Sequence, residues 1–276
     1  MLSRQNGAGV EALAPFFMIT LLSESKTMES RQEAVSPDIL KQHTPVLEET
    51  ADNIMSYLAT LSPLQISQNL GISIQLGKKA HDLAYDFNHK LTGYPAIFGF
   101  TGEAFRAFDV KSLDPTRLEA ADEKLRIISS VYGILKPHDI IKPYRCEFNK
   151  PVTSDSKTPI QIFKSKVTIE FVKLIKENKV AEVIDLLPAD ADKCLDWKII
   201  RAFTSVQKIC FQVITNEGKL KTPLARRLKE LRGLMARDIL EKNIQTFEQL
   251  KTLESENYIF SPQDSKTGLP VFISSE

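Results

Sequence analysis

The chain has 276 residues, of which 42% are hydrophobic and 26% are charged, and its formal net charge at pH 7 is +1. These values are typical of a soluble globular protein, and they exclude a disordered chain or a strongly basic, histone-like one. The three cysteines are far apart and form no Cys-x-x-Cys pair. This pattern argues against a disulfide framework or a structural zinc site, and it predicts a reducing, cytoplasmic environment.

The N-terminal region contains an apolar run from Ala14 to Leu22. Its flanks lack the basic residues and the small-residue cleavage site of a signal peptide, and no run approaches the roughly 18 residues that span a bilayer. We therefore predict a core strand over 16–22 and no membrane segment. We expect one domain over 18–276, preceded by a disordered extension or a mis-assigned start in residues 1–17.

Apolar residues at helical spacing predict the helices of the first half of the chain. These helices are expected over 46–61, 62–70, 74–87 and 114–131, with a short strand over 97–100. Ser62 and Asp114, each followed by proline, are typical N-caps.

The second half alternates between the two kinds of element. Helices are predicted over 164–178 and from Thr222 to near Asn243, and strands over 180–187, 197–203, 208–215, 258–260 and 270–273. Strands scattered among helices indicate a single mixed α/β domain.

The segment from Leu125 to Phe148 contains two Lys-Pro pairs. Tyr132-Gly133 is interpreted as the end of the preceding helix, since glycine followed by proline stops a helix. The prolines stiffen the connector that follows, which would present Lys136, Lys142 and Arg145. An anion site and a solvated loop are equally compatible with this segment alone.

The sequence Leu70-Gly71-Ile72-Ser73 joins two predicted helices. A glycine turn exposes backbone N–H groups at the start of the next helix, where a phosphate can bind, and Lys78 could support it. A plain helical hairpin is the commoner explanation of this pattern.

The segment Lys219 to Arg237 holds seven cations and one anion. On a helical wheel Leu224, Leu228, Leu231 and Met235 form one stripe, and Gly233 lies opposite it on the polar face. A solvated face is the usual role of such charges. The excess of one sign and the glycine, which permits close approach of another chain or a phosphate, favour an anion-binding face.

Lys26 follows the first strand, where α/β sheets place ligand contacts. It could be a nucleophile, a phosphate ligand or an exposed lysine, and the last two are the commoner cases. Metal-binding patterns are weak. One predicted helix carries His81, Asp82, Asp86 and His89, but they form no His-Glu-x-x-His motif. A cluster of acids follows a predicted strand (Asp185, Asp190, Asp192 and Asp196), and a solvated acidic loop is its commoner explanation.

Four ordered segments carry a family resemblance: SESKT (Ser23 to Thr27), FTGEAFRAFD (Phe100 to Asp109), YGILKPHDIIKPYR (Tyr132 to Arg145) and RGLMAR (Arg232 to Arg237). They resemble Ser-Pro-Ala-Lys-Thr, Lys-Gly-Asp-Val-Tyr-x-Gly-Leu, Tyr-Gly-Leu-Leu-(Arg/Lys)-Pro-x-Asp-x-x-x-Pro-Tyr-Arg and Ala-Arg-Gly-x-Met-x-Arg of the bacterial YaaA peroxide-stress-resistance family. The family's Asn-Leu-Ala-Ser-x-Glu-Tyr segment reads DLLPADADKCL here, which is typical of a divergent member.

The resemblance implies a compact α/β domain with a helix-hairpin-helix-like element and a basic cleft. It implies a cytoplasmic protein that binds duplex DNA, mainly through its backbone, and limits iron-driven oxidative damage in the peroxide stress response. We expect a monomer with no cofactor and no metal. The predicted nucleic-acid-binding residues are Lys26, Gly71, Ser73, Lys78, Lys136, Arg145, Lys229, Arg232 and Arg237.

Two alternatives remain open from the sequence. One is an enzyme that acts on a nucleoside or on damaged nucleic acid, with Lys26 in its active site. The other is iron sequestration through histidine and aspartate side chains.

Overall fold

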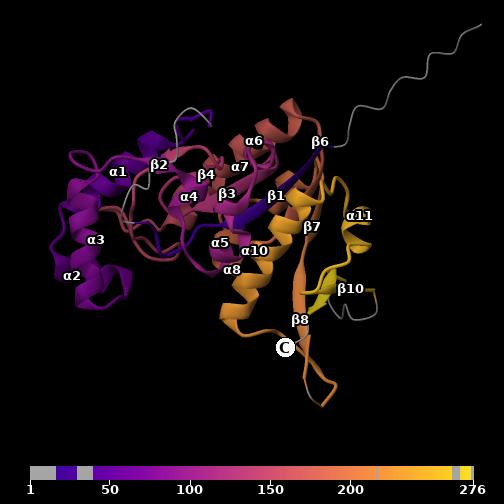
Figure 1. The fold of residues 1–276 in the computed structure, drawn as a ribbon. Helices are drawn as coiled ribbons and strands as arrows, with labels where there is room; N and C mark the ends of the chain where they lie inside the picture. Colours follow the sequence, from indigo (N-terminus) through magenta and orange to yellow (C-terminus); the bar gives the residue numbers. More distant parts are fainter. Residues whose placement is uncertain (1–16, 30–39, 216, 263–267, 275–276) are drawn as a thin grey trace, which may run out of the picture.

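The computed structural model describes residues 17–29, 40–215, 217–262 and 268–274 (Figure 1). Within these ranges a five-stranded sheet has the order β4-β3-β1-β6-β7. Its strands are β1 (Phe17–Ser23), β3 (Leu125–Ser129), β4 (Gly133–Leu135), β6 (Val180–Asp185) and β7 (Ser205–Lys208). Neighbouring strands are parallel except for the β3–β4 pair.

Helices cover both faces of this sheet. Successive side chains of a strand point to opposite faces, so Ile19 and Leu21 of β1 enter one core while Met18 and Leu22 enter the other. Helices α1 (Glu48–Ala59), α3 (Ile74–Asp86) and α7 (Pro159–Glu177) contribute to the first core. Helices α6 (Pro115–Lys124) and α10 (Ala225–Glu241) contribute to the second.

A smaller sheet follows β7 almost without a break. It has the order β10-β11-β8-β9, from β10 (Ile259–Ser261), β11 (Val271–Ser274), β8 (Cys210–Ile214) and β9 (Leu220–Lys221). Figure 1 shows β7 and β8 running in line beside α10. Phe211, Tyr258 and Phe272 pack together here, with ring centroids 5.7–6.4 Å apart.

Shorter elements connect these layers. They are α2 (Pro63–Leu70), β2 (Tyr94–Pro95), α4 (Ala96–Gly99), α5 (Glu103–Phe108), η1 (Val110–Ser112), β5 (Ile140–Ile141), α8 (Ala189–Asp192), α9 (Trp197–Ile200) and α11 (Phe247–Lys251).

The mixed α/β fold predicted from the sequence is confirmed, as are the first strand and the helices α1, α2, α3, α7 and α10. The predicted N-caps are present: Ser62 and Asp114 accept hydrogen bonds from the backbone N–H groups of Gln65 and Arg117. The expectations for residues 1–16 lie outside the described residues.

Three elements were predicted wrongly. Residues 97–100 lie mostly in helix α4, and the predicted strand 197–203 begins with helix α9, which the Asp196 side chain caps. The predicted helix 114–131 ends at Lys124 and continues as β3. Leu125–Ser129 is buried along its whole length, and a short apolar run of this kind does not distinguish helix from strand until its sheet partners are known.

Candidate functional site at the carboxyl edge of the sheet

The parallel strands β1, β3 and β6 end at one edge of the sheet, and the strand order changes direction at β1. Ligands of open α/β sheets bind outside the carboxyl ends of strands at such a point. A cavity of about 440 Å³ lies there. It is lined by Ser23–Thr27 after β1, by residues after β6, and by side chains of α5 and α10.

The loop after β1 is fixed by short-range contacts. The Thr27 N–H donates to Ser25 Oγ at 3.1 Å, and the Ser25 hydroxyl donates to the Thr27 carbonyl at 2.8 Å. Gly102, the N-cap of α5, lies so close that an added Cβ would be 2.2 Å from Ser25 Oγ. This packing holds both Glu24 and Lys26 in the cavity lining.

The Glu24 carboxylate accepts hydrogen bonds from three donor groups on two residues, Ser130 and Tyr144, and none of these groups is a cation. Oε2 accepts from the Ser130 N–H at 2.9 Å and from the Tyr144 hydroxyl, and Oε1 accepts from the Ser130 hydroxyl at 2.5 Å. Ser129 Oγ is 2.7 Å from the Tyr144 hydroxyl. Burial raises the pKa of Glu24 to about 7, although the hydrogen bonds from Ser130 and Tyr144 oppose that rise.

This network was not visible in the sequence. Ser130 and Tyr144 lie 106 and 120 residues from Glu24 along the chain. The pairing of β1 with β3 brings Ser130 to Glu24, and Tyr144 reaches it from the segment after β5. Glu24 and Lys26 follow the last residue of β1, Ser23, so the alternation of a strand does not set the directions of their side chains.

Four of the predicted cations lie at this cavity or next to it. Lys26, which is 53% exposed, pairs with Glu147, and the Arg145 guanidinium donates to the Lys26 carbonyl at 3.1 Å and to Glu147 at 3.2 Å. Arg232 and the exposed Lys229 approach from α10. Burial lowers the pKa of Arg232, and the charges of Asp185 and Asp190 oppose that change. Lys229 has no ion-pair partner within the described ranges.

Lys136 and Arg237 lie elsewhere, so the prediction that they share one cleft with these cations is wrong. Lys136 lines a second cavity, of about 760 Å³, near the start of β1 at Phe17. The Arg237 guanidinium donates to the carbonyls of Phe108 and Asp109, at 2.8 and 2.5 Å, and to Ser112 at 2.8 Å. It therefore ties α10 to the turn after α5.

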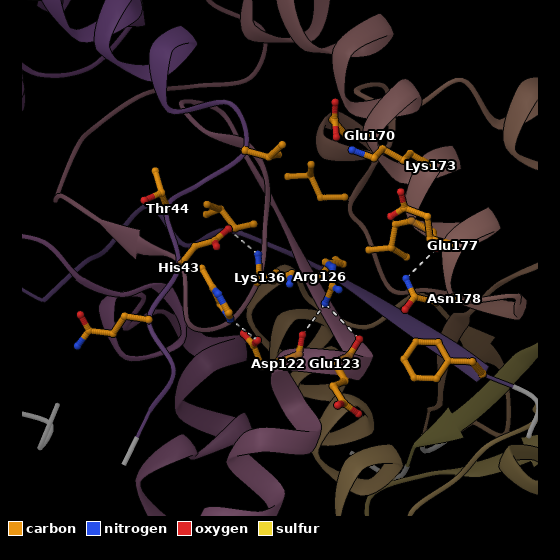
Figure 2. Close-up of a pocket in the computed structure, with 17 residues that line it drawn as sticks. His43, Thr44, Asp122, Glu123, Arg126, Lys136, Glu170, Lys173, Glu177 and Asn178 are labelled. Carbon is orange, nitrogen blue, oxygen red and sulfur yellow. Dashed lines mark hydrogen bonds and ion pairs between the residues drawn. The ribbon is translucent and has the colours of Figure 1, made fainter. Parts of the chain in front are cut away.

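The second cavity lies at the amino edge of the sheet, and the polar side chains that line it make contacts with one another and with nearby backbone groups (Figure 2). His43 Nε2 is 2.8 Å from Asp122 Oδ2, and the buried Arg126 donates to the Asp122 carbonyl at 2.7 Å. Burial lowers the pKa of Arg126 to about 10. The Asp139 carboxylate accepts a hydrogen bond from the Lys136 N–H, and burial raises the pKa of Asp139 to about 6. These contacts join α6, β3 and the β4–β5 turn.

The predicted helical hairpin is formed by α2 and α3, with Gly71 in a left-handed conformation at φ 64° and Ser73 as the N-cap of α3. Lys150 stands over this turn, since a Cβ added to Gly71 would be 3.2 Å from Lys150 Nζ. No pattern in the sequence pointed to Lys150. It follows Glu147 of the carboxyl-edge cavity by three residues, a span of at most about 10 Å. Lys78 is exposed on α3.

Gly233 has a different role from the one predicted. It is buried, and an added Cβ would lie 1.9 Å from the Ala104 carbonyl oxygen of α5. Leu224, placed on the apolar stripe, is 81% exposed. The close approach that Gly233 permits is therefore between α10 and α5, and side chains of both helices line the cavity.

Two of the acidic residues at the end of β6 and after it contact a lysine. Lys208 Nζ lies 2.8 Å from Asp185 and 2.5 Å from Asp192. Asp196 caps α9. Among the residues that the structure describes, no group of three or more histidine, cysteine, aspartate and glutamate side chains is placed to hold a metal ion. No helix in the same ranges is both long and apolar enough to cross a bilayer.

Comparison with known proteins supports the resemblance noted in the sequence. Residues 18–264 match the family model described as peroxide stress protein YaaA. A UPF0246 protein of Polynucleobacter necessarius is 29% identical over 92% of this chain and 98% of its own length. A UPF0246 protein of Shewanella pealeana is 26% identical over 94% of this chain and 100% of its own length. UPF0246 protein lpl1317 of Legionella pneumophila is 27% identical over 93% of this chain and 99% of its own length. The chain belongs to the peroxide stress protein YaaA family.

Proposed function

We propose that this chain binds duplex DNA through its phosphates during the peroxide stress response, and that the carboxyl-edge cavity and the α2–α3 turn contact the same strand. The observation that carries the proposal is the grouping of Lys26, Lys229 and Arg232 around one cavity, with Lys150 over the nearby turn. Bound in this way in the cytoplasm, the protein would limit iron-driven damage by covering the DNA.

The spacing of these groups fits a nucleic-acid backbone. One DNA strand carries a phosphate every 3.4 Å of helix axis, so the segment from Glu147 to Lys150, at most about 10 Å long, spans roughly three nucleotides. The N–H groups at the start of α3 and the Lys150 ammonium would bind one phosphate, and the cavity cations another. Contacts of this kind position a protein on DNA without reading its sequence.

The test is the salt dependence of binding to a short duplex, measured by fluorescence anisotropy. Contacts from Lys26, Lys150, Lys229 and Arg232 predict a log–log slope of about −3.6, since each contact on duplex DNA contributes about −0.9. Affinity should vary little among unrelated sequences. An affinity that does not change with salt would contradict the proposal.

An enzyme that acts on a nucleoside or on damaged nucleic acid is the second candidate, and Glu24 is the observation that favours it. A carboxyl whose pKa is raised to about 7 by burial, in a cavity with cations, is typical of an acid–base site. Lys26 is half exposed and paired with Glu147, which suits a phosphate ligand better than a desolvated nucleophile.

Borohydride trapping on DNA with an abasic site distinguishes the two candidates. A lysine nucleophile forms a Schiff base that borohydride reduces to a covalent adduct. We expect no adduct, and we expect Lys26→Arg to keep most of the affinity because the positive charge remains. An adduct that forms with the natural sequence and is absent in Lys26→Arg would favour the enzyme.

A further inference from the structure

Charges around the carboxyl-edge cavity are nearly balanced. Among the described residues that line it are four cations, Lys26, Arg106, Lys229 and Arg232, and four carboxyl groups, Glu24, Glu103, Glu147 and Asp190. With every group ionised the lining has no net charge. The carboxylates offset the cations, so the attraction of the lining for an anion depends on how many of these carboxyl groups are ionised.

Three of the four carboxyl groups already lie beside a cation. Glu147 pairs with Lys26, Glu103 is 2.5 Å from Arg106, and the charge of Asp190 acts on Arg232. Glu24 differs, because its partners are the Ser130 amide and the hydroxyls of Ser130 and Tyr144. The protonation of Glu24 therefore decides whether the lining is neutral or carries one positive charge.

We propose that the cavity binds one phosphate group of its ligand together with one proton, and that Glu24 takes up this proton. The inference rests on the proposed function, because it assigns the cavity to a phosphate of the bound strand. An anion beside Glu24 repels its carboxylate and favours the neutral acid. Binding and protonation then strengthen each other by the same factor.

Among the described residues, the charge of Glu24 acts on Cys146, Cys194 and Tyr144, and none of these three titrates near neutral pH. Burial raises the pKa of Glu24 to about 7. Burial also raises the pKa of the Cys146 and Cys194 thiols to about 12, so both stay uncharged. The pKa of Tyr144 is raised well above its usual value by burial and by the Glu24 charge.

Isothermal titration of the full chain with sodium sulfate tests the inference, because sulfate keeps its charge across this pH range and phosphate does not. Repeating the titration in two buffers of different ionisation enthalpy counts the protons taken up. We expect uptake of close to one proton above pH 7, and an affinity that falls up to tenfold for each further pH unit. Glu24→Gln should remove both the uptake and the pH dependence.

Two variants provide the controls. Glu103→Gln changes the formal charge by the same amount at a carboxylate paired with Arg106, so it should raise the affinity and leave the proton uptake in place. Tyr144→Phe removes a donor that stabilises the Glu24 carboxylate, so it should move the pH profile upwards. It also provides the test if Glu24→Gln does not fold.

The inference is overturned if sulfate does not bind, if it binds without proton uptake, or if Glu24→Gln keeps the uptake. Salt-dependent DNA binding without proton uptake would leave the proposed function standing and remove only this inference. Proton-linked sulfate binding in a protein that does not bind DNA would remove the proposed function and leave the proton-linked anion site standing.

Discussion

At the scale of single residues, the position of a charge matters more than its presence in the sequence. Lys26, Lys229 and Arg232 were predicted from the family resemblance, from the excess of cations over 219–237 and from the strand before Lys26. All three lie at one cavity. Arg237 is an arginine on the same helix as Arg232, but its guanidinium donates hydrogen bonds to the backbone carbonyls at the end of α5. Only the fold separates these two roles.

Glu24 should make the stability of the protein depend on pH. The folded state holds this proton more tightly than the unfolded chain, whose carboxyl titrates near 4.5. The resulting stabilisation is complete below that pH and is lost as the pH rises through about 7. The shift corresponds to at most about 3 kcal/mol.

Urea unfolding near pH 5 and near pH 8 tests this expectation. The free energy of unfolding should fall between them in the natural sequence, and fall less in Glu24→Gln. Burial raises the pKa of Asp139 to about 6, which acts in the same direction in both proteins, so their difference reports on Glu24. Equal declines in the two proteins would show that the Glu24 pKa is not raised.

Gly233→Ala should destabilise the protein by about 1–3 kcal/mol, the usual cost of overpacking a core. A methyl group there would meet the Ala104 carbonyl, so α10 and α5 would move apart and the cavity walls with them. At an exposed helical position the same substitution stabilises by about 1 kcal/mol. The sign of the change in unfolding free energy therefore tests whether Gly233 is buried against α5.

At the scale of elements, local signals predicted where helices begin, and tertiary contacts decided the rest. Ser62 and Asp114 mark helix starts because their side chains bond to backbone amides a few residues later. The end of α6 could not be read in the same way, because Leu125–Ser129 becomes a strand by pairing with β1. Gly133, taken as a helix end, adopts φ 74° at the start of β4.

The α2–α3 turn should contribute one phosphate contact through Lys150. Lys150→Ala should weaken DNA binding and reduce the magnitude of the salt slope by about 0.9. Lys157→Ala is a matched control, because Lys157 is exposed nearby in the chain and pairs with Asp155 at 2.7 Å. Equal effects of the two substitutions would indicate non-specific attraction to surface charge.

At the scale of the whole molecule, the two cavities described above lie at opposite edges of one sheet, and topology distinguishes them. The larger one surrounds the buried contacts of Arg126 and Asp122, and the smaller one lies where β1, β3 and β6 end. The sequence predicted the sheet and most of the cations. It could not place Lys136 and Arg232 at different edges, since that requires the strand order.

The most direct test of the account compares Arg232→Gln with Lys136→Gln in duplex DNA binding over a range of salt concentrations. Each variant removes one positive charge, but from a different edge of the sheet. We predict that Arg232→Gln weakens binding about tenfold or more and reduces the magnitude of the salt slope by about 0.9, since it removes a charged phosphate contact. Lys136→Gln should change neither quantity. Equal losses in the two variants, or a loss confined to Lys136→Gln, would contradict the assignment of the carboxyl-edge cavity as the binding site.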